Sequence, residues 1–342
     1  MKKVVLVTGG AGYIGSHTVV ELHNAGYNPV ILDNFRNSKP WILDRIQKIT
    51  GQKPIFHNVD CQNEEAVFEI VKNYANCVGL IHFAADKAVG ESVKKPVKYY
   101  KNNIGSLCVM LNAMNEFGIE NMVFSSSCTV YGEVSNPVVT EKSPIKTATS
   151  PYGDTKITCE KLIQYTVDAS AEIKATLLRY FNPIGAHPSG LIGELPQGVP
   201  NNLMPYITQT AKGIREKLTV FGGDYNTIDG TNIRDYIHVV DLAKAHVKAL
   251  KLIIDTAEKG CDAINLGTGK GTSVLEIIKT FETANNVKLN YEIGPRRDGD
   301  VEQIYANAEK AKKVLDWQCE LTLEDAMKHS WEWEKGLESE SE

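Results

Sequence analysis

Short apolar runs alternate with longer segments of helical length through the first half of the chain. The runs are rich in β-branched residues and lack alternating polar positions, a pattern typical of parallel strands buried on both faces. They lie at residues 4–7, 29–32, 54–56, 78–83, 122–125 and 175–178. The alternation of such strands with helical segments predicts an α/β fold built on a doubly wound parallel sheet.

The pattern changes after Tyr180. Residues 182–205 are rich in proline and glycine and show little periodicity, which indicates a loop. Beyond it we predict helices at 205–212, 240–254, 274–285 and 323–335 and short strands at 218–221, 263–266 and 289–292. We therefore expect a first domain over residues 1–182 and a smaller C-terminal mixed α/β domain over 183–342, with parts of 235–266 rejoining the first.

A glycine-rich loop directly follows the first strand and opens a helical segment that ends at Gly26. Gly9 permits a tight turn, Gly12 lets the backbone approach a pyrophosphate, and Gly15 allows close helix packing. The N–H groups at the start of the helix can bind the anion. The loop therefore predicts a dinucleotide site in a Rossmann-like domain.

Asp33 closes the second strand, where a carboxylate can accept hydrogen bonds from the adenosine ribose and repels a 2′-phosphate. This residue predicts NAD rather than NADP as the cofactor.

A second glycine-rich string, residues 267–272, lacks the glycine and hydroxyl spacing of a loop that binds a nucleoside triphosphate. We interpret it as a strand-to-helix turn.

Tyr152 and Lys156 share one face of a helical segment that begins after Ser150-Pro151. A tyrosine is about 3 pKa units too weak a base at pH 7, but a neighbouring ammonium together with a cationic nicotinamide would favour its phenolate. Ser127, just after a predicted strand, can bond the same substrate oxygen. In a chain with a dinucleotide loop, these three residues predict a catalytic group.

The 342 residues carry 37 Lys and Arg against 42 Asp and Glu, a net charge of −5. This balance argues against binding to nucleic acid or an anionic membrane surface, and no apolar run approaches the ~18 residues that span a bilayer. The seven cysteines are odd in number, widely spaced and include no C-x-x-C pair. We therefore expect reduced thiols in a cytoplasmic protein, and no metal site.

Six further motifs accompany the glycine loop and the Tyr152–Lys156 pair, and together they cover nearly the whole chain. They are residues 87–92, 125–132, 179–183, 201–205, 234–238 and 295–300. With them the chain resembles the extended short-chain dehydrogenase/reductase family, and within it the UDP-galactose 4-epimerases. It departs from that pattern at two places, since Ala85-Asp86 stands where Gly-Leu is common and Cys128 stands where Ala is usual.

The resemblance also implies which residues hold two ligands. Besides those named above, the implied contacts to NAD are Tyr13, Ile14, Asn34, Asn37, Ser38, Asp60, Cys61, Phe83, Ala84, Ala85, Lys87, Asn102 and Tyr180. The implied contacts to a UDP-sugar are Lys87, Ser127, Asn182, Asn202, Leu203, Phe221, Arg234, Tyr236, Arg297, Asp300 and Ile304. Arginine forks and amides suit a diphosphate, and an aromatic wall suits uracil.

The implied reaction inverts the C4 hydroxyl of UDP-galactose or UDP-glucose through a transient 4-keto sugar, with Tyr152 as the base and tightly bound NAD. A 4,6-dehydratase of the same superfamily carries Asp-Glu where this chain has Cys128-Thr129, which disfavours that elimination. A UDP-glucuronate or UDP-N-acetylglucosamine 4-epimerase stays open as an alternative. A non-catalytic NAD-binding regulator also stays open, although such proteins typically lose the Tyr or the Lys.

Two further expectations concern assembly and substrate range. Ile304 takes the position that borders the C2 substituent of the sugar in similar epimerases. Because Ile304 is smaller than Tyr but stiff, it predicts fast turnover of UDP-galactose and slow turnover of UDP-N-acetylgalactosamine.

The segments 104–117 and 157–169 look apolar on two faces. One apolar stripe can cover the sheet, so the second stripe predicts a homodimer, as the resemblance also implies. In the first segment the stripes are Ile104, Leu107, Leu111 and Met114, and Val109, Met110, Ala113 and Phe117.

Overall fold

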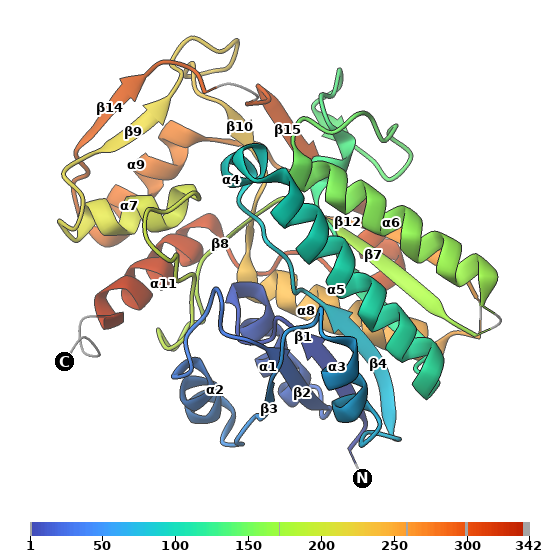
Figure 1. Ribbon diagram of the computed structural model, residues 1–342. Helices are drawn as coiled ribbons and strands as arrows, with labels where there is room; N and C mark the ends of the chain where they lie inside the picture. The colour runs from blue at the N-terminus through green and yellow to red at the C-terminus, as the bar shows by residue number, and fades with distance from the viewer. Residues whose placement is uncertain (1, 171, 258, 298–299, 338–342) are drawn as a thin grey trace.

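A seven-stranded parallel sheet forms the central layer of the computed structural model, which describes residues 2–170, 172–257, 259–297 and 300–337 (Figure 1). The strand order is β3-β2-β1-β4-β5-β7-β12, and neighbouring strands are parallel throughout. The strands are β1 (Val4–Thr8), β2 (Asn28–Asp33), β3 (Ile55–Asn58), β4 (Cys77–His82), β5 (Asn121–Ser125), β7 (Lys174–Tyr180) and β12 (Cys261–Leu266). The predicted doubly wound α/β architecture is therefore confirmed, with strand ends within about two residues of those predicted.

Helices cover both faces of this sheet because alternate residues of each buried strand point to opposite sides. On β1, Val5 and Val7 belong to one core cluster and Val4 and Leu6 to the other. The first face is covered by α1 (Tyr13–Asn24), α2 (Ile42–Thr50), α8 (Val239–Asp255) and α10 (Glu309–Leu315). The second face is covered by α3 (Glu64–Val71), α5 (Pro96–Phe117) and α6 (Pro151–Ala169).

A second, smaller lobe with its own apolar core lies beyond the carboxyl ends of the sheet strands (Figure 1). Its helices are α7 (Leu203–Ala211), α9 (Val274–Asn285) and α11 (Leu323–Gly336). Its short strands are β9 (Leu218–Phe221), β10 (Ile233–Arg234), β13 (Thr272–Ser273), β14 (Tyr291–Gly294) and β15 (Gln303–Ala306). The strand predicted at 289–292 therefore begins two residues later, and β10, β13 and β15 were not predicted.

Several short elements complete the chain. They are α4 (Val89–Lys94), a 3₁₀ turn over Cys128–Tyr131, β6 (Val138–Val139), and the parallel pair β8 (Asn182–Ile184) and β11 (Tyr236–His238). After β11 the chain returns to the first lobe through α8 and β12, the edge strand beside β7. Ser273 caps α9, because its side chain accepts a hydrogen bond from Glu276 N at 3.1 Å. The division into two domains at residue 182 stays a prediction.

The second apolar stripe of α5 packs against other parts of the same chain. It is therefore not evidence for a homodimer, contrary to the prediction from the sequence. Val109, Met110 and Ala113 are buried in the core cluster that α5 shares with α3. Phe117 stacks edge to face on Phe68 of α3, with ring centroids 5.3 Å apart. The stripe itself therefore offers no surface to a second copy.

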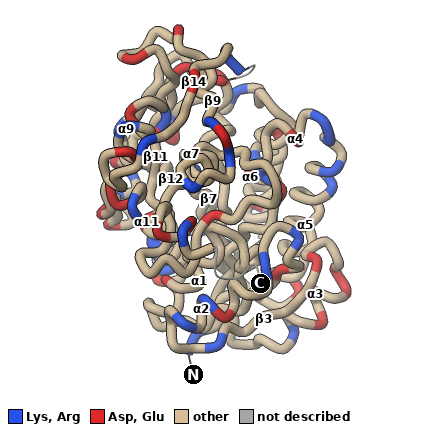
Figure 2. The backbone as a smooth tube through the Cα atoms, turned by 90° about the vertical axis from the view of Figure 1, so that its left-hand side faces the viewer, with Lys and Arg blue, Asp and Glu red and all other residues tan. Residues whose placement is uncertain are grey.

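Charges are mixed over the surface. Figure 2 shows Lys and Arg interspersed with Asp and Glu along the backbone, in keeping with the small net charge. Among the described residues, no helix combines the length and the apolar character needed to cross a membrane.

Candidate active site

The glycine loop lies between the carboxyl ends of β1, β2 and β4. Gly9 has a φ of +67°, and a Cβ on it would lie 2.9 Å from Ala84 N. A Cβ on Gly15 would lie 2.2 Å from Gly9 O, so the helix can approach the loop only without a side chain there. Gly12 caps α1 without a side-chain hydrogen bond, which leaves the N–H groups of the first turn available for an anion. These features fit a dinucleotide pyrophosphate.

Asp33 is fixed beside this loop. Its Oδ2 accepts a hydrogen bond from Ala11 N at 3.1 Å, and its Oδ1 accepts from Phe35 N at 2.8 Å and Ser38 Oγ at 3.3 Å. Burial raises its pKa, and these hydrogen bonds lower it. The carboxylate is thus held at the end of β2, where a ribose diol of NAD would meet it.

The other implied cofactor positions surround the same edge of the sheet. Asn34 Nδ2 donates to Asp60 Oδ2 at 3.4 Å, and Gln62 Nε2 donates to Asn102 Oδ1 at 3.3 Å. Tyr180 Oη accepts a hydrogen bond from Ser125 Oγ at 2.9 Å. The remaining positions follow strand ends in the same region: Tyr13, Ile14, Asn37 and Ser38 after β1 and β2, Cys61 after β3, and Phe83, Ala84, Ala85 and Lys87 after β4.

The second glycine-rich string does not form a ligand site. Its N–H groups instead bind a fully buried carboxylate of the same chain, because Asp235 accepts hydrogen bonds from Thr268 N at 2.8 Å and Gly269 N at 3.1 Å. Thr268 Oγ1 also donates to this carboxylate at 2.7 Å. The string joins β12 to β13 and α9, as the interpretation as a strand-to-helix turn predicts.

Tyr152, Lys156 and Ser127 come together where α6 packs against the end of β5. Ser150 caps the helix by accepting from Gly153 N at 3.2 Å, and Pro151 occupies its first position, so both local signals start α6 just before Tyr152. Lys156 Nζ lies 6.0 Å from the centre of the Tyr152 ring. Ser127 lies close enough to the Tyr152 hydroxyl to lower its pKa, so the three predicted catalytic residues form one group.

Burial dominates the ionisation of this group. It raises the pKa of Tyr152 well above its usual value, and the neighbouring Ser127 only partly opposes this. Burial also lowers the pKa of Lys156 to about 8. The protein alone therefore does not favour the phenolate, and the positive charge of an oxidised nicotinamide, which the sequence-based prediction invoked together with the lysine, would be needed in addition.

A cluster of charged residues in the second lobe forms the other end of the site. Asp300 Oδ1 lies 2.7 Å from Arg297 Nη2 and 4.0 Å from Arg234 Nη2, and the Arg297 guanidinium lies 5.8 Å from the centre of the Phe221 ring. Burial raises the pKa of Tyr236 to about 12, while the charge of Arg234 lowers it. Two arginines beside an aromatic ring suit a nucleoside diphosphate. Residues 298–299 of this motif lie outside the described residues.

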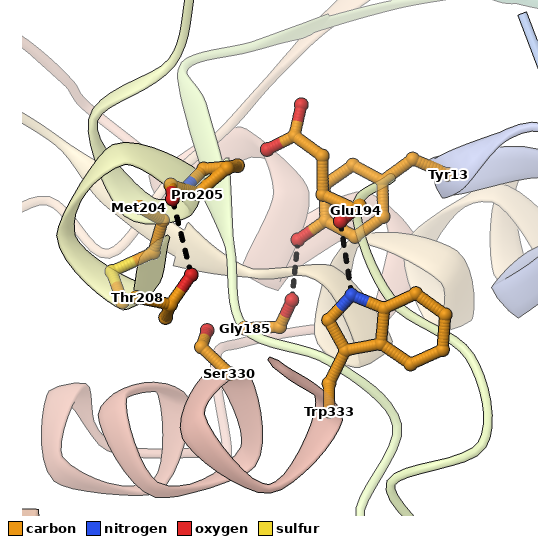
Figure 3. A pocket seen from close by; sticks show the side chains of 8 residues that line it. All are labelled: Tyr13, Gly185, Glu194, Met204, Pro205, Thr208, Ser330 and Trp333. Carbon is orange, nitrogen blue, oxygen red and sulfur yellow. Dashed lines mark hydrogen bonds between the residues drawn. The ribbon is translucent and has the colours of Figure 1, made fainter. Parts of the chain in front are cut away.

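Glu194 is a site residue that the sequence did not suggest. Its Oε1 accepts hydrogen bonds from Lys87 Nζ at 2.7 Å and Asn202 Nδ2 at 2.6 Å, so it joins an implied cofactor contact to an implied substrate contact. It lies in the segment read as a loop, where no periodicity or motif marks it. The cavity beside it, between the lobes, is lined by Tyr13, Gly185, Glu194, Met204, Pro205, Thr208, Ser330 and Trp333 (Figure 3).

The other implied substrate positions lie on short elements of the later part of the chain. Asn182 lies on β8, while Asn202 and Leu203 begin α7. Ile304 lies on β15 beside Arg234 and is buried in a cluster with Ile157 and Phe181. The described part of the chain holds no group of three or more His, Cys, Asp and Glu arranged to bind a metal ion.

Comparison with known proteins places this arrangement among characterised relatives. A family profile described as GDP-mannose 4,6 dehydratase matches residues 6–330. The chain is 50% identical to a UDP-glucose 4-epimerase of Dictyostelium discoideum, covering 96% of this chain and 95% of that protein. It is 48% identical to a human UDP-glucose 4-epimerase, covering 98% and 97%.

Solved structures of UDP-glucose 4-epimerases also match the fold of this chain. The fold matches a UDP-glucose 4-epimerase from Bifidobacterium longum in complex with NAD⁺ and UDP with a TM-score of 0.93 at 45% identity, covering 97% of this chain and 98% of that one. It matches a Stenotrophomonas maltophila UDP-glucose-4-epimerase with bound NAD and formylated UDP-arabinopyranose with a TM-score of 0.95 at 44% identity, covering 98% and 99%.

Proposed function

The chain belongs to the UDP-glucose 4-epimerase family of extended short-chain dehydrogenases/reductases, and from this premise we propose that it interconverts UDP-glucose and UDP-galactose with tightly bound NAD. The observation that carries the proposal is the group formed by Ser127, Tyr152 and Lys156 at the carboxyl edge of the sheet. This group lies between the glycine loop and the arginine cluster of the second lobe, where a nucleotide sugar can meet a dinucleotide.

Tyr152 acts as the acid and base of the reaction. Its phenolate takes the proton of the sugar C4 hydroxyl as the C4–H bond breaks, and the hydroxyl so formed returns the proton when the alcohol forms again. Ser127 lies beside the Tyr152 hydroxyl and would hold the reacting sugar oxygen next to it. NAD, when bound, would supply the hydride acceptor and donor for the sugar C4.

The cofactor would be held by the first lobe. The glycine loop and the start of α1 would bind its pyrophosphate, and Asp33 would bind the adenosine ribose. Lys156 lies beside Tyr152, at the catalytic group. Because burial keeps water from Tyr152 and Lys156, their charges and dipoles act more strongly there than at the surface.

The substrate would be held chiefly through its UDP part. Arg234, Arg297 and Phe221 offer two guanidinium groups and an aromatic face. Affinity concentrated on UDP leaves the sugar free to turn over, which inversion at C4 requires. Lys87 is an implied contact to NAD, Asn202 is an implied contact to the UDP-sugar, and both donate hydrogen bonds to Glu194. Glu194 therefore connects residues proposed to hold the two ligands.

The alternatives differ in the residues that they need. A 4,6-dehydratase requires an acid/base pair at positions 128 and 129, and this chain has Cys128, whose pKa burial raises to about 12, and Thr129. A UDP-glucuronate or UDP-N-acetylglucosamine epimerase would use the same catalytic group. The intact Tyr152–Lys156 pair disfavours a non-catalytic regulator.

Two measurements test the proposal. Denaturing the purified protein should release NAD, and mixing the native protein with UDP-galactose should form UDP-glucose, followed by NMR. Release of no dinucleotide would contradict the cofactor assignment. Turnover of UDP-glucuronate or UDP-N-acetylglucosamine alone would replace the substrate assignment by one of the alternatives.

We also propose a cytoplasmic homodimer that associates through the outer sides of α5 and α6. Val97 on α5 is 77% exposed and Tyr165 on α6 is 69% exposed, which supports this surface in place of the buried stripe. All seven cysteines are free thiols, in keeping with a reducing compartment. Light scattering at micromolar protein should give twice the chain mass, and a monomeric mass would contradict the dimer.

A further inference from the structure

An ion pair spans the glycine loop. Arg36 Nη2 lies 2.7 Å from Asp86 Oδ1. Arg36 follows β2 and Asp86 follows β4, and these two strands flank β1, whose carboxyl end carries the loop. The two side chains therefore meet across the edge of the sheet that receives the cofactor pyrophosphate in the proposed function.

Both ends of the ion pair are anchored to this edge. On the β2 side, Arg36 N donates to Asn34 Oδ1 at 3.1 Å, and Asp33 binds the loop through Ala11 N. On the β4 side, Asp86 N donates to Asn103 Oδ1 at 2.8 Å, and Asn103 Nδ2 donates to Asp86 O at 3.1 Å. Because Asn103 is a buried residue of α5, the backbone of Asp86 is fixed to the helix layer.

The Asp86 carboxylate has few other interactions. Its side chain is 12% exposed, against 42% for Arg36, and its Oδ2 has no hydrogen-bond partner among the described residues. Lys98 Nζ lies 4.0 Å from this Oδ2, and Glu91, which Lys98 also binds, adds a like charge nearby. Breaking the contact with Arg36 would leave Asp86 with one distant cation, so the paired arrangement is favoured.

We propose that Arg36 and Asp86 form a latch over the bound dinucleotide that slows its release. The proposal rests on the proposed function, since it needs NAD in the groove. In this proposal the bound pyrophosphate lies beneath the ion pair at the glycine loop, so that its release requires the segments following β2 and β4 to separate. The latch gives a physical reason for a cofactor that stays bound while it is reduced and oxidised in each turnover.

The test measures release of NAD directly. Protein loaded with NAD is mixed with an excess of a dehydrogenase and its substrate, which reduce any released NAD, and the absorbance of NADH reports the release rate. Variants are Arg36→Ala, Asp86→Asn, the double variant and the charge swap Arg36→Asp with Asp86→Arg. Lys217→Ala, which breaks the exposed ion pair to Glu292 in the second lobe, is the matched control.

We expect each single variant to release NAD about 2- to 5-fold faster, as for loss of a partly exposed ion pair. The double variant should be no faster than the singles, the charge swap should restore slow release, and the control should match wild type. Added salt should speed release from wild type and not from Asp86→Asn. A variant that fails to fold is recognised by its circular dichroism and set aside, and the charge swap then decides.

The outcomes separate the latch from the proposed function. Protein that binds no NAD contradicts the proposed function. Bound NAD with unchanged release in all variants overturns the latch alone. Faster release in Arg36→Ala but not in Asp86→Asn also overturns it, because Arg36 would then contact the cofactor directly.

Discussion

Lys156 Nζ donates a hydrogen bond to the backbone carbonyl oxygen of Ser125 at 2.7 Å. Ser125 is the last residue of β5, so one ammonium group ties helix α6 to the strand end that Ser127 follows. The same ammonium lies 4.8 Å from the centre of the Phe124 ring and is removed from water. Lys156 therefore fixes the position of Tyr152 as well as placing a charge near it.

The lowered pKa of Lys156 predicts the alkaline limb of the activity profile. Burial lowers it to about 8, so the ammonium, and with it kcat, should be lost as the pH rises through that value. Titration of Lys156 does not itself destabilise the fold here, because between pH 8 and about 10.4 the unfolded lysine binds more protons and its contribution to stability rises with pH. The pH profile of kcat, measured for wild type and for Lys156→Arg, checks this. If the alkaline limb has the same midpoint pH in that variant, a group other than Lys156 causes it.

Tyr152→Phe removes the proposed base and keeps the ring. We expect kcat to fall about 10²- to 10⁴-fold, as for loss of general acid–base catalysis, while UDP binding stays nearly unchanged. Calorimetry with UDP and NMR of turnover provide the two readouts. Activity within threefold of wild type would remove Tyr152 from the mechanism and point to Ser127 or a water molecule.

Asp33→Ala should weaken retention of NAD and reduce its preference over NADP. In the proposed function the carboxylate, held by Ala11 N, would accept hydrogen bonds from the adenosine ribose and repel a 2′-phosphate. The dinucleotide released from wild type and variant by denaturation can be identified by mass spectrometry. Mainly NADP from the wild-type protein would show that Asp33 does not select the cofactor.

Much of the first lobe could be predicted from local patterns. Its strands are continuous apolar runs, and the spacing from Tyr152 to Lys156 is a property of one helix. The strands β10 and β13 have two residues each, so they carry no periodicity and exist only through pairing with distant segments. Glu194 and the Arg36–Asp86 pair also join segments far apart in sequence, which no local signal reveals.

The same lack of information about distant segments explains why the second apolar stripe of α5 was wrongly interpreted as a dimer surface. A second apolar stripe shows that a helix is covered on two sides, but the sequence does not say by what. In the structure α3 covers it, with Phe68 against Phe117. An apolar stripe alone therefore cannot distinguish a subunit interface from packing within the chain.

Glu160→Gln should destabilise the fold strongly. Glu160 and Arg179 are both buried, with Arg179 Nη2 at 2.6 Å from Oε2 and Nε at 2.9 Å from Oε1. Loss of the carboxylate charge leaves the guanidinium buried without a counter-charge, which costs about 3–5 kcal/mol in the free energy of unfolding. Urea denaturation measures this, and Glu292→Gln, in an exposed pair, should change little.

Ile304 on β15 is buried in an apolar cluster, and its neighbours bear on the proposed substrate range. It packs with Ile157, Phe181 and Cys128, and Cys128 follows Ser127 in the chain. The next residue, Tyr305, points the other way, since a Cβ on Gly271 would lie 3.1 Å from its ring. Because side chains alternate along a strand, Ile304 lies on the face of β15 that joins this cluster and Tyr305 on the opposite face, and we propose that Ile304 is the one that borders the sugar.

We expect efficient epimerisation of UDP-galactose and slower epimerisation of UDP-N-acetylgalactosamine. A β-branched side chain leaves more room than Tyr but cannot swing aside. Ile304→Tyr should lower kcat/KM for the N-acetylated sugar by roughly 10-fold or more relative to UDP-galactose, and Ile304→Ala should raise the same ratio. Using the ratio of the two substrates corrects for any general loss of activity that the larger side chain causes by overpacking. Tyr305→Phe, which alters the opposite face of the strand, should leave the ratio unchanged. A ratio that moves with Tyr305 and not with Ile304 would show that the other face of β15 borders the sugar.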